Sequence, residues 1–232
     1  MFDVEYNGVK ASDLGVMIAQ RPNIPAPELK ISELDVAGRD GTLIQKDSYG
    51  NIKIEVEMNY MTKPDRWGET YRAVKDWLLL SSGDRQLKFT DDGTVFYKVK
   101  HVVVGENERE AKETGVITPS FLCDPFTYLV SGLRACTLEE ITYNPYHTSC
   151  PIYKITGEGI CALDINGKTL AVNVGQNATV DTDLMIAYRE DGTLINAQVY
   201  GYYEDGRLKP GNIRLSASDG FKIEVIPNWR CL

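Results

Sequence analysis

Most of this chain alternates between apolar and polar residues with a period of two, and turn residues interrupt the alternation at short intervals. The alternation is clearest from Ile52 to Tyr60, where every second residue is apolar. Successive side chains of a β-strand point to opposite faces of a sheet, so this pattern is typical of half-buried strands. The sequence therefore predicts a mostly β protein with a minor helical part.

The N-terminal half contains several further strand signals. Phe2–Tyr6 alternates and is followed by Asn7-Gly8, a pair that favours a tight hairpin turn. Another extended segment is expected to begin at Leu29. Three more strands are expected over 86–90, 94–104 and 117–122.

One segment has helical rather than strand periodicity. Pro64-Asp65 suits the first turn of a helix, and Ser81-Ser82-Gly83 suits its end. Between them, apolar residues recur at spacings that place them on one face: Trp67, Tyr71, Val74, Trp77 and Leu78. We expect a helix near 65–80 whose aromatic face anchors it on a sheet; a ligand platform is the alternative.

The C-terminal half reads as strands and turns throughout, with no helix. Asn166-Gly167 predicts a hairpin, and strands recur about every 8–12 residues, which is typical of a β-sandwich. Asp124-Pro125 is expected to end the last strand of the first half, and Ser131-Gly132 to add flexibility. The boundary is therefore placed near 129–135, giving domains 1–130 and 131–232.

The composition narrows the classes of function. The formal net charge is -8, whereas binding to a phosphate backbone needs clustered cations, so no specific nucleic-acid binding is expected. No apolar run approaches the roughly 18 residues of a membrane span, and the acidic N-terminus lacks the features of a signal peptide. The five cysteines are an odd number without a CxxC pair, which argues against a disulfide framework and a structural zinc site.

A search for catalytic residues finds no convincing set. The only histidines are His101, in an alternating run, and His147, in a loop-like segment. Paired carboxylates could indicate a glycosidase; the candidates are Asp91/Asp92, Asp181/Asp183 and Glu204/Asp205. The first and last pairs sit in turn signatures, and phosphate and calcium loops lack the required spacing. The sequence predicts no enzyme, no cofactor and no metal.

Several motifs, taken in order, resemble the distal tail protein family of long-tailed phages that infect Gram-positive bacteria. None is specific alone, but together they span essentially the whole chain. In the first half they are Phe2–Val9, Ser12–Val16, Val36–Leu43 (similar to a V-x-G-R-D-G-x-L element) and Phe121–Tyr128. In the second half they are Asn144-Pro145, Pro151–Gly157, Ile165–Lys168, Asp181, Leu208–Asn212 and Val225–Arg230.

The resemblance implies a fold and an assembly. The fold would be an N-terminal ring-forming β domain with one helix, followed by a galectin-like β-sandwich. The family implies a structural hub of a phage or prophage tail tip, a hexameric ring that in some cases stacks with a second ring. Its partners would be the tail tube protein, a tail-associated tip protein and receptor-binding or baseplate proteins, with a channel for DNA. It would act in the virion tail tip after assembly in the host cytoplasm.

Some alternatives stay open. Gly38, Arg39, Asp40 and Gly41 suit a tight loop whose charged residues pair between subunits, and a purely intramolecular turn is an equal alternative. A glycan-binding adhesion module is the second hypothesis, with Tyr200, Tyr202 and Tyr203 as candidates. A strand would place Tyr200 and Tyr202 on one face, which favours a core or interface role. An enzyme using Asp181 is the third.

Overall fold

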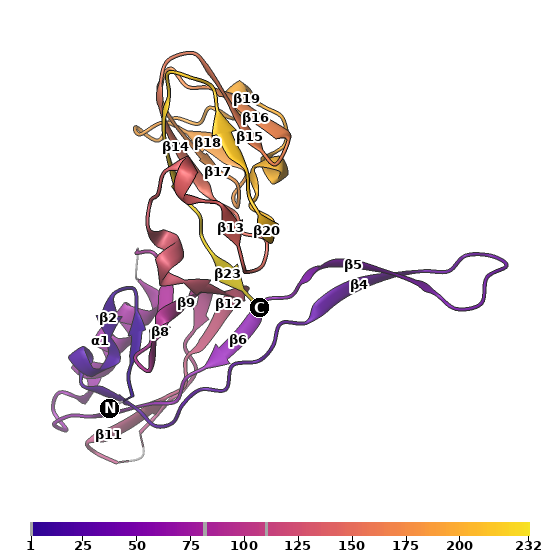
Figure 1. Ribbon diagram of the computed structural model, residues 1–232. Helices are drawn as coiled ribbons and strands as arrows, with labels where there is room; N and C mark the ends of the chain where they lie inside the picture. Colours follow the sequence, from indigo (N-terminus) through magenta and orange to yellow (C-terminus); the bar gives the residue numbers. More distant parts are fainter. Residues whose placement is uncertain (1, 81–82, 110) are drawn as a thin grey trace. The chain divides into compact units, whose positions relative to one another are not determined.

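The computed structural model describes residues 2–80, 83–109 and 111–232. The protein is mostly β, as predicted, with one α-helix among the described residues (Figure 1). The chain divides into two compact units, Met1–Thr127 with Leu232 (unit 1) and Tyr128–Cys231 (unit 2).

Unit 1 contains two sheets and a separate hairpin. The strands of its larger sheet follow the order β2 (Val9–Lys10), β1 (Val4–Tyr6), β8 (Gln86–Phe89), β9 (Asp92–Val103) and β12 (Ser120–Leu129), with β6 (Ile52–Glu55) also paired to β12. The smaller sheet has the order β10 (Asn107–Glu108), β11 (Thr114–Ile117), β7 (Met58–Met61) and β3 (Val16–Ile18). A 3-10 turn, η1 (Ala11–Leu14), connects β2 to β3. The hairpin consists of β4 (Leu29–Leu34) and β5 (Leu43–Tyr49), which within the described residues pair only with each other.

The predicted helix is present as α1 (Trp67–Leu79), and its aromatic face packs on the core of unit 1. Val74, Trp77 and Leu78 are buried, and the indole Nε1–H of Trp77 donates to the carbonyl of Tyr6 (3.0 Å). The anchoring interpretation is therefore confirmed. Ser81 and Ser82, expected to end the helix, lie outside the described residues.

Two segments that read as continuous strands instead change sheets. The alternating run 52–60 forms β6 in one sheet and β7 in the other, and the expected strand 117–122 is divided between β11 and β12. At the change, the Val56 N–H donates to the carbonyl of Pro119 (3.1 Å). The alternation of apolar and polar residues continues across the change of sheet because both sheets bury their apolar face in the same core.

The prediction that Asp124-Pro125 ends a strand is wrong, because β12 runs through both residues. Its neighbour β6 pairs only with Ser120–Cys123, so that ladder ends before Pro125. Proline is tolerated beyond the end of a ladder because its missing N–H is not needed there.

Unit 2 is a sandwich of two four-stranded antiparallel sheets around its own core. One sheet has the order β18 (Ile186–Tyr188), β17 (Gln176–Asp181), β14 (Ile152–Gly157) and β22 (Lys222–Ile226); the other has β19 (Val199–Tyr200), β16 (Lys168–Asn173), β15 (Ile160–Ile165) and β21 (Leu215–Ala217). The strands β13 (Tyr143–Asn144) and β20 (Gly211–Asn212) pair separately, and β23 (Arg230–Cys231) follows near the C-terminus.

As expected, no α-helix interrupts the described residues of unit 2, but they contain short 3-10 turns: η2 (Val130–Leu133), η3 (Leu138–Glu140), η4 (Asn196–Gln198) and η5 (Tyr203–Gly206). The expected strand over 197–203 is therefore only β19, two residues long. Gly201, which follows β19, has a φ of 104°, and a Cβ there would lie 2.8 Å from the carbonyl oxygen of Thr169. This positive φ ends the strand and turns the chain toward η5.

Candidate assembly surface

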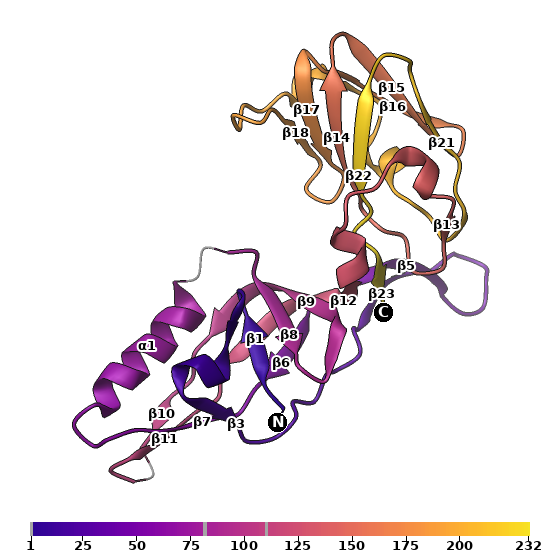
Figure 2. The same ribbon diagram turned by 60° about the vertical axis from the view of Figure 1, so that its left-hand side comes forward.

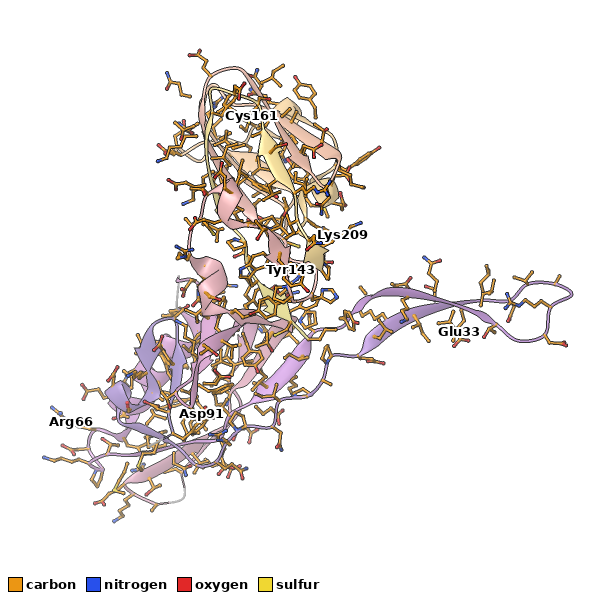
Figure 3. The ribbon with its side chains drawn as sticks, in the orientation of Figure 1. Glu33, Arg66, Asp91, Tyr143, Cys161 and Lys209 are labelled. Carbon is orange, nitrogen blue, oxygen red and sulfur yellow. The ribbon has the colours of Figure 1, made fainter. Side chains whose placement is uncertain are left out.

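The hairpin of β4 and β5, called the arm below, is the least buried part of unit 1. Every residue from Lys30 to Ser48 is exposed, and Figures 1 and 2 show the two strands extending away from the sheets of unit 1. In Figure 3 its side chains, with Glu33 labelled, point outward on both sides of the ribbon. The arm exposes five large apolar side chains: Ile31, Leu34, Val36, Leu43 and Ile44.

The apolar residues occupy both faces of the arm. Leu34 lies directly opposite Leu43, and Glu33 lies opposite Ile44. Since adjacent residues of a strand face opposite sides, Leu43 and Ile44 project from different faces. An isolated two-stranded hairpin is at best marginally stable in water, and exposed apolar groups on both faces add a penalty that a partner surface would remove.

The base of the arm is anchored in unit 1. The N–H of Gly50 donates to the carbonyl of Glu28 (2.7 Å), and the ring of Tyr49 meets that of Phe126 edge-on, with centroids 6.0 Å apart. Near the base, the hydroxyl of Ser32 donates to the carboxylate of Asp47. Of these contacts, the Tyr49–Phe126 pair joins the arm to β12, and the other two hold its strands together.

The loop identified from the sequence forms the tip of this arm. Gly38 and Gly41 both have positive φ (81° and 79°), and the N–H of Arg39 donates to the carbonyl of Val36 (3.1 Å). Arg39 and Asp40 are exposed, and within the described residues neither forms an ion pair with another side chain. The glycines thus have an intramolecular role in the turn, and the two charged side chains remain available to a partner.

The candidate catalytic carboxylates are engaged in local structure. Asp181 is buried at the end of β17, and its Oδ1 accepts the N–H groups of Asp183 (2.8 Å) and Leu184 (2.9 Å). Asp183 lies beyond the strand in the following turn, so the two carboxylates do not lie on one face of β17. The carboxylate of Asp183 is 4.0 Å from Nη1 of Arg230.

The other candidate acids also have structural partners. Asp92 accepts the hydroxyl of Thr94 (2.6 Å), an interaction that lowers the pKa of this exposed carboxyl. Asp91 pairs with Arg21, and Asp205 pairs with Lys168. These three acids are therefore used by a turn or a surface ion pair, whereas Glu204 is an exposed residue of η5.

Cys150 is a buried thiol of unit 2 with several charged neighbours. The pKa of this thiol is raised chiefly because burial disfavours the thiolate. Smaller electrostatic effects come from the charges of Arg230, Asp183 and Arg207. A nucleophilic cysteine needs a lowered pKa instead. This environment keeps Cys150 a neutral thiol at physiological pH.

The tyrosines proposed for sugar contact differ from one another. Tyr200 and Tyr202 are 54% and 75% exposed, so a core role for them is wrong. Tyr203 is half-buried, packs on the core of unit 2, and its hydroxyl donates to Oδ1 of Asn196 (3.4 Å).

Two further observations concern sites and membranes. Among the described residues, no group of three or more His, Cys, Asp or Glu side chains is placed to hold a metal ion. Within the same residues, the helices are too short or too polar to cross a membrane.

Comparison with solved structures shows what this fold is similar to. The crystal structure of the Dit (gp 19.1) protein of phage SPP1, described as a paradigm of the hub adsorption apparatus in phages infecting Gram-positive bacteria, matches with a TM-score of 0.63 at 15% identity. The match covers 97% of this chain and 98% of that one.

Two structures of the phage P2 baseplate in its activated conformation also match. The calcium form gives a TM-score of 0.54 at 10% identity, covering 96% of this chain and 97% of the other; the strontium form gives 0.50 at 11%, with the same coverage. No family model and no curated protein sequence matches the chain. The resemblance to distal tail proteins found in the sequence is thus supported by the fold along nearly the whole chain.

Proposed function

We propose that this protein is a structural hub of a phage or prophage tail tip. It would form a hexameric ring that joins the tail tube to the baseplate and receptor-binding proteins and leaves a channel for DNA. The observation that carries this proposal is the match to the SPP1 Dit hub over 97% of the chain. Because one fold can serve several functions, the surface of this chain is a second line of support.

The arm supplies that support. A ring is a heterologous assembly, in which one surface of each subunit docks on a different surface of the next. An anchored hairpin with uncovered apolar residues on both faces is suited to be one of those two surfaces. We propose that Arg39 and Asp40, at its tip, form ion pairs with the neighbouring subunit.

The partners follow from the hub role. They would be the tail tube protein, a tail-associated tip protein and the receptor-binding or baseplate proteins, with assembly in the bacterial cytoplasm and a final place in the virion tail tip. The net charge of -8 suits a channel that lets DNA pass without gripping it. The role is structural, without catalysis.

The test is the mass of the purified protein in solution, measured by light scattering on a size-exclusion column at several concentrations. We expect a hexamer, or a dodecamer of two rings, and negative-stain images showing a ring with a central opening. Arg39→Glu should weaken assembly, whereas Arg134→Glu, an exposed arginine of unit 2, is the matched control. A protein that stays monomeric and forms no ring with the tube protein added would refute the proposal.

A second function has one observation in its favour, the exposure of Tyr200 and Tyr202. Exposed tyrosines can stack on sugar rings, so the chain would act as a glycan-binding adhesion module. Binding of the whole protein to a glycan array that disappears in Tyr202→Ala would support this. An array without binding would exclude it.

A further inference from the structure

An apolar groove of about 750 Å³ lies on unit 1 along the free edge of β3. Its apolar wall consists of Phe2, Val16, Met17, Ile18 and Met61. Met17 and Met61 are 43% and 65% exposed. Methionine side chains are flexible and polarizable, and surfaces that bind other proteins use them often.

The edge of β3 can accept another strand. Within the described residues β3 pairs with β7 alone, and the next hydrogen bond of that ladder runs from the N–H of Ala19 to the carbonyl of Glu57 (3.0 Å). Because bonded and non-bonded pairs alternate in an antiparallel ladder, the N–H and C=O groups of Val16 and Ile18 point toward the free edge. Such an edge is a template for pairing with another chain.

The charges of the groove suit a partner that carries a carboxylate at the right position. Lys10 is its single cation, and within the described residues it has no ion pair. The one acid of the lining, Asp3, already accepts the hydroxyl of Ser12 (2.6 Å) and the N–H of Val4 (2.8 Å). The lining is formally neutral, and the ammonium group of Lys10 is available to pair with a carboxylate of an incoming strand.

We infer that the groove receives the arm of a second copy of this chain. The outer half of the arm carries Glu33 and Asp35, and either carboxylate can pair with Lys10. Its Leu34–Leu43 pair would cover Met17 and Met61, and its strand edge would extend the sheet at β3. This inference rests on the proposed function only in taking a second copy as the partner.

The test maps the contact directly on the full-length protein. A photoreactive benzoylphenylalanine replaces Leu34, isotope-labelled and unlabelled proteins are mixed and irradiated, and the adducts are located by mass spectrometry. We expect mixed-isotope adducts at Met17 or Met61. The same group at Ile160, which is exposed to almost the same extent (60% against 62%), is the control and should give none there.

Groove variants then test the chemistry. Met61→Glu places a carboxylate on the apolar wall and opposite an acidic arm, and should reduce the adduct yield about tenfold, whereas Met61→Leu should retain it. Thermal unfolding must be the same for both variants, since this side chain is largely exposed. An unchanged yield in Met61→Glu would overturn the inference.

The outcomes separate this inference from the proposed ring. Adducts on another surface of a hexamer, or no adducts at all, would refute the groove and leave the ring standing. Adducts in the groove of subunits that form an open, non-hexameric chain would refute the proposed ring but support the inference that the groove binds the arm. Adducts of one isotope only would mean that the arm folds back on its own unit, which also overturns the inference.

Discussion

At the scale of single residues, the buried thiols show how the core constrains ionisation. Cys123 and Cys161 are fully buried, and burial raises the pKa of Cys123 from 9.0 to about 12 and that of Cys161 to about 11. Three of the five cysteines are buried among the core residues. The half-buried Cys136 and Cys231 are the exceptions.

This pKa shift predicts a loss of stability at alkaline pH. In the unfolded chain the Cys123 thiol ionises near its ordinary value of 9.0, whereas the folded protein keeps it neutral until about 12. The free energy of unfolding should therefore be unaffected below pH 9 and fall as the pH rises above it, by about 1 kcal/mol at pH about 10 from this thiol. Urea denaturation of wild type and Cys123→Ala, each measured below pH 9 and at pH about 10, checks this prediction.

The test compares how much the free energy of unfolding of each protein changes with pH. The stability that the variant loses because alanine is smaller is the same at both pH values, so it cancels. Wild type should lose more stability than Cys123→Ala between the two pH values. Equal losses would show that the thiol does not contribute.

At the scale of elements, α1 is held by packing and by one buried hydrogen bond. Trp77 and Trp67 both belong to the aromatic face, but only Trp77 donates from its indole, to the carbonyl of Tyr6 (3.0 Å). The indole Nε1 of Trp67 is buried without a hydrogen-bond partner, and the ring stacks on Tyr71 with centroids 5.9 Å apart.

The two tryptophans therefore form a matched pair for mutation. Trp77→Phe removes this buried hydrogen bond and should lower the free energy of unfolding by about 0.5–1.5 kcal/mol more than the loss of buried area alone. Trp67→Phe removes a donor that has no partner, so it should lower the free energy of unfolding by less than Trp77→Phe does. Denaturant titration of both variants measures the difference; a larger loss for Trp67→Phe would contradict the assignment.

At the scale of the whole molecule, two units with separate cores predict separate folding. The N-terminal residues of unit 2 contact its C-terminal segment: the N–H of Leu129 donates to the carbonyl of Trp229 (2.9 Å), and the N–H of Asn228 donates to that of Gly132 (2.9 Å). A Cβ on Gly132 would lie 2.4 Å from the backbone nitrogen of Trp229, so the two backbones are in close contact. The segment 128–133 therefore belongs structurally to unit 2.

This contact predicts where a stable fragment of unit 2 must begin. A fragment of residues 128–232 should unfold cooperatively on its own, whereas a fragment of 134–232 loses both hydrogen bonds and should be less stable by about 1–3 kcal/mol. Circular dichroism during thermal unfolding compares the two fragments. If both melt alike, the boundary lies beyond Leu133.

The local features can be predicted from the sequence, because they depend on neighbours along the chain. Alternation defined most strands, Asn7-Gly8 and Asn166-Gly167 marked hairpin turns with positive φ, and the spacing from Trp67 to Leu78 defined α1. The glycines at 38 and 41 likewise predicted a tight loop with exposed charges.

Which strands share a sheet and which remain uncovered depends on long-range pairing, which local patterns do not contain. Periodicity is the same for a strand that stays in one sheet and one that changes sheets, so the division of 52–60 is invisible in sequence. The apolar residues of the arm, such as Leu34 and Leu43, resemble core positions, yet they are exposed because β4 and β5 have no further partner among the described strands. The groove at β3 combines Phe2, Met17 and Met61, which are distant along the chain and meet only when long-range pairing brings their strands together.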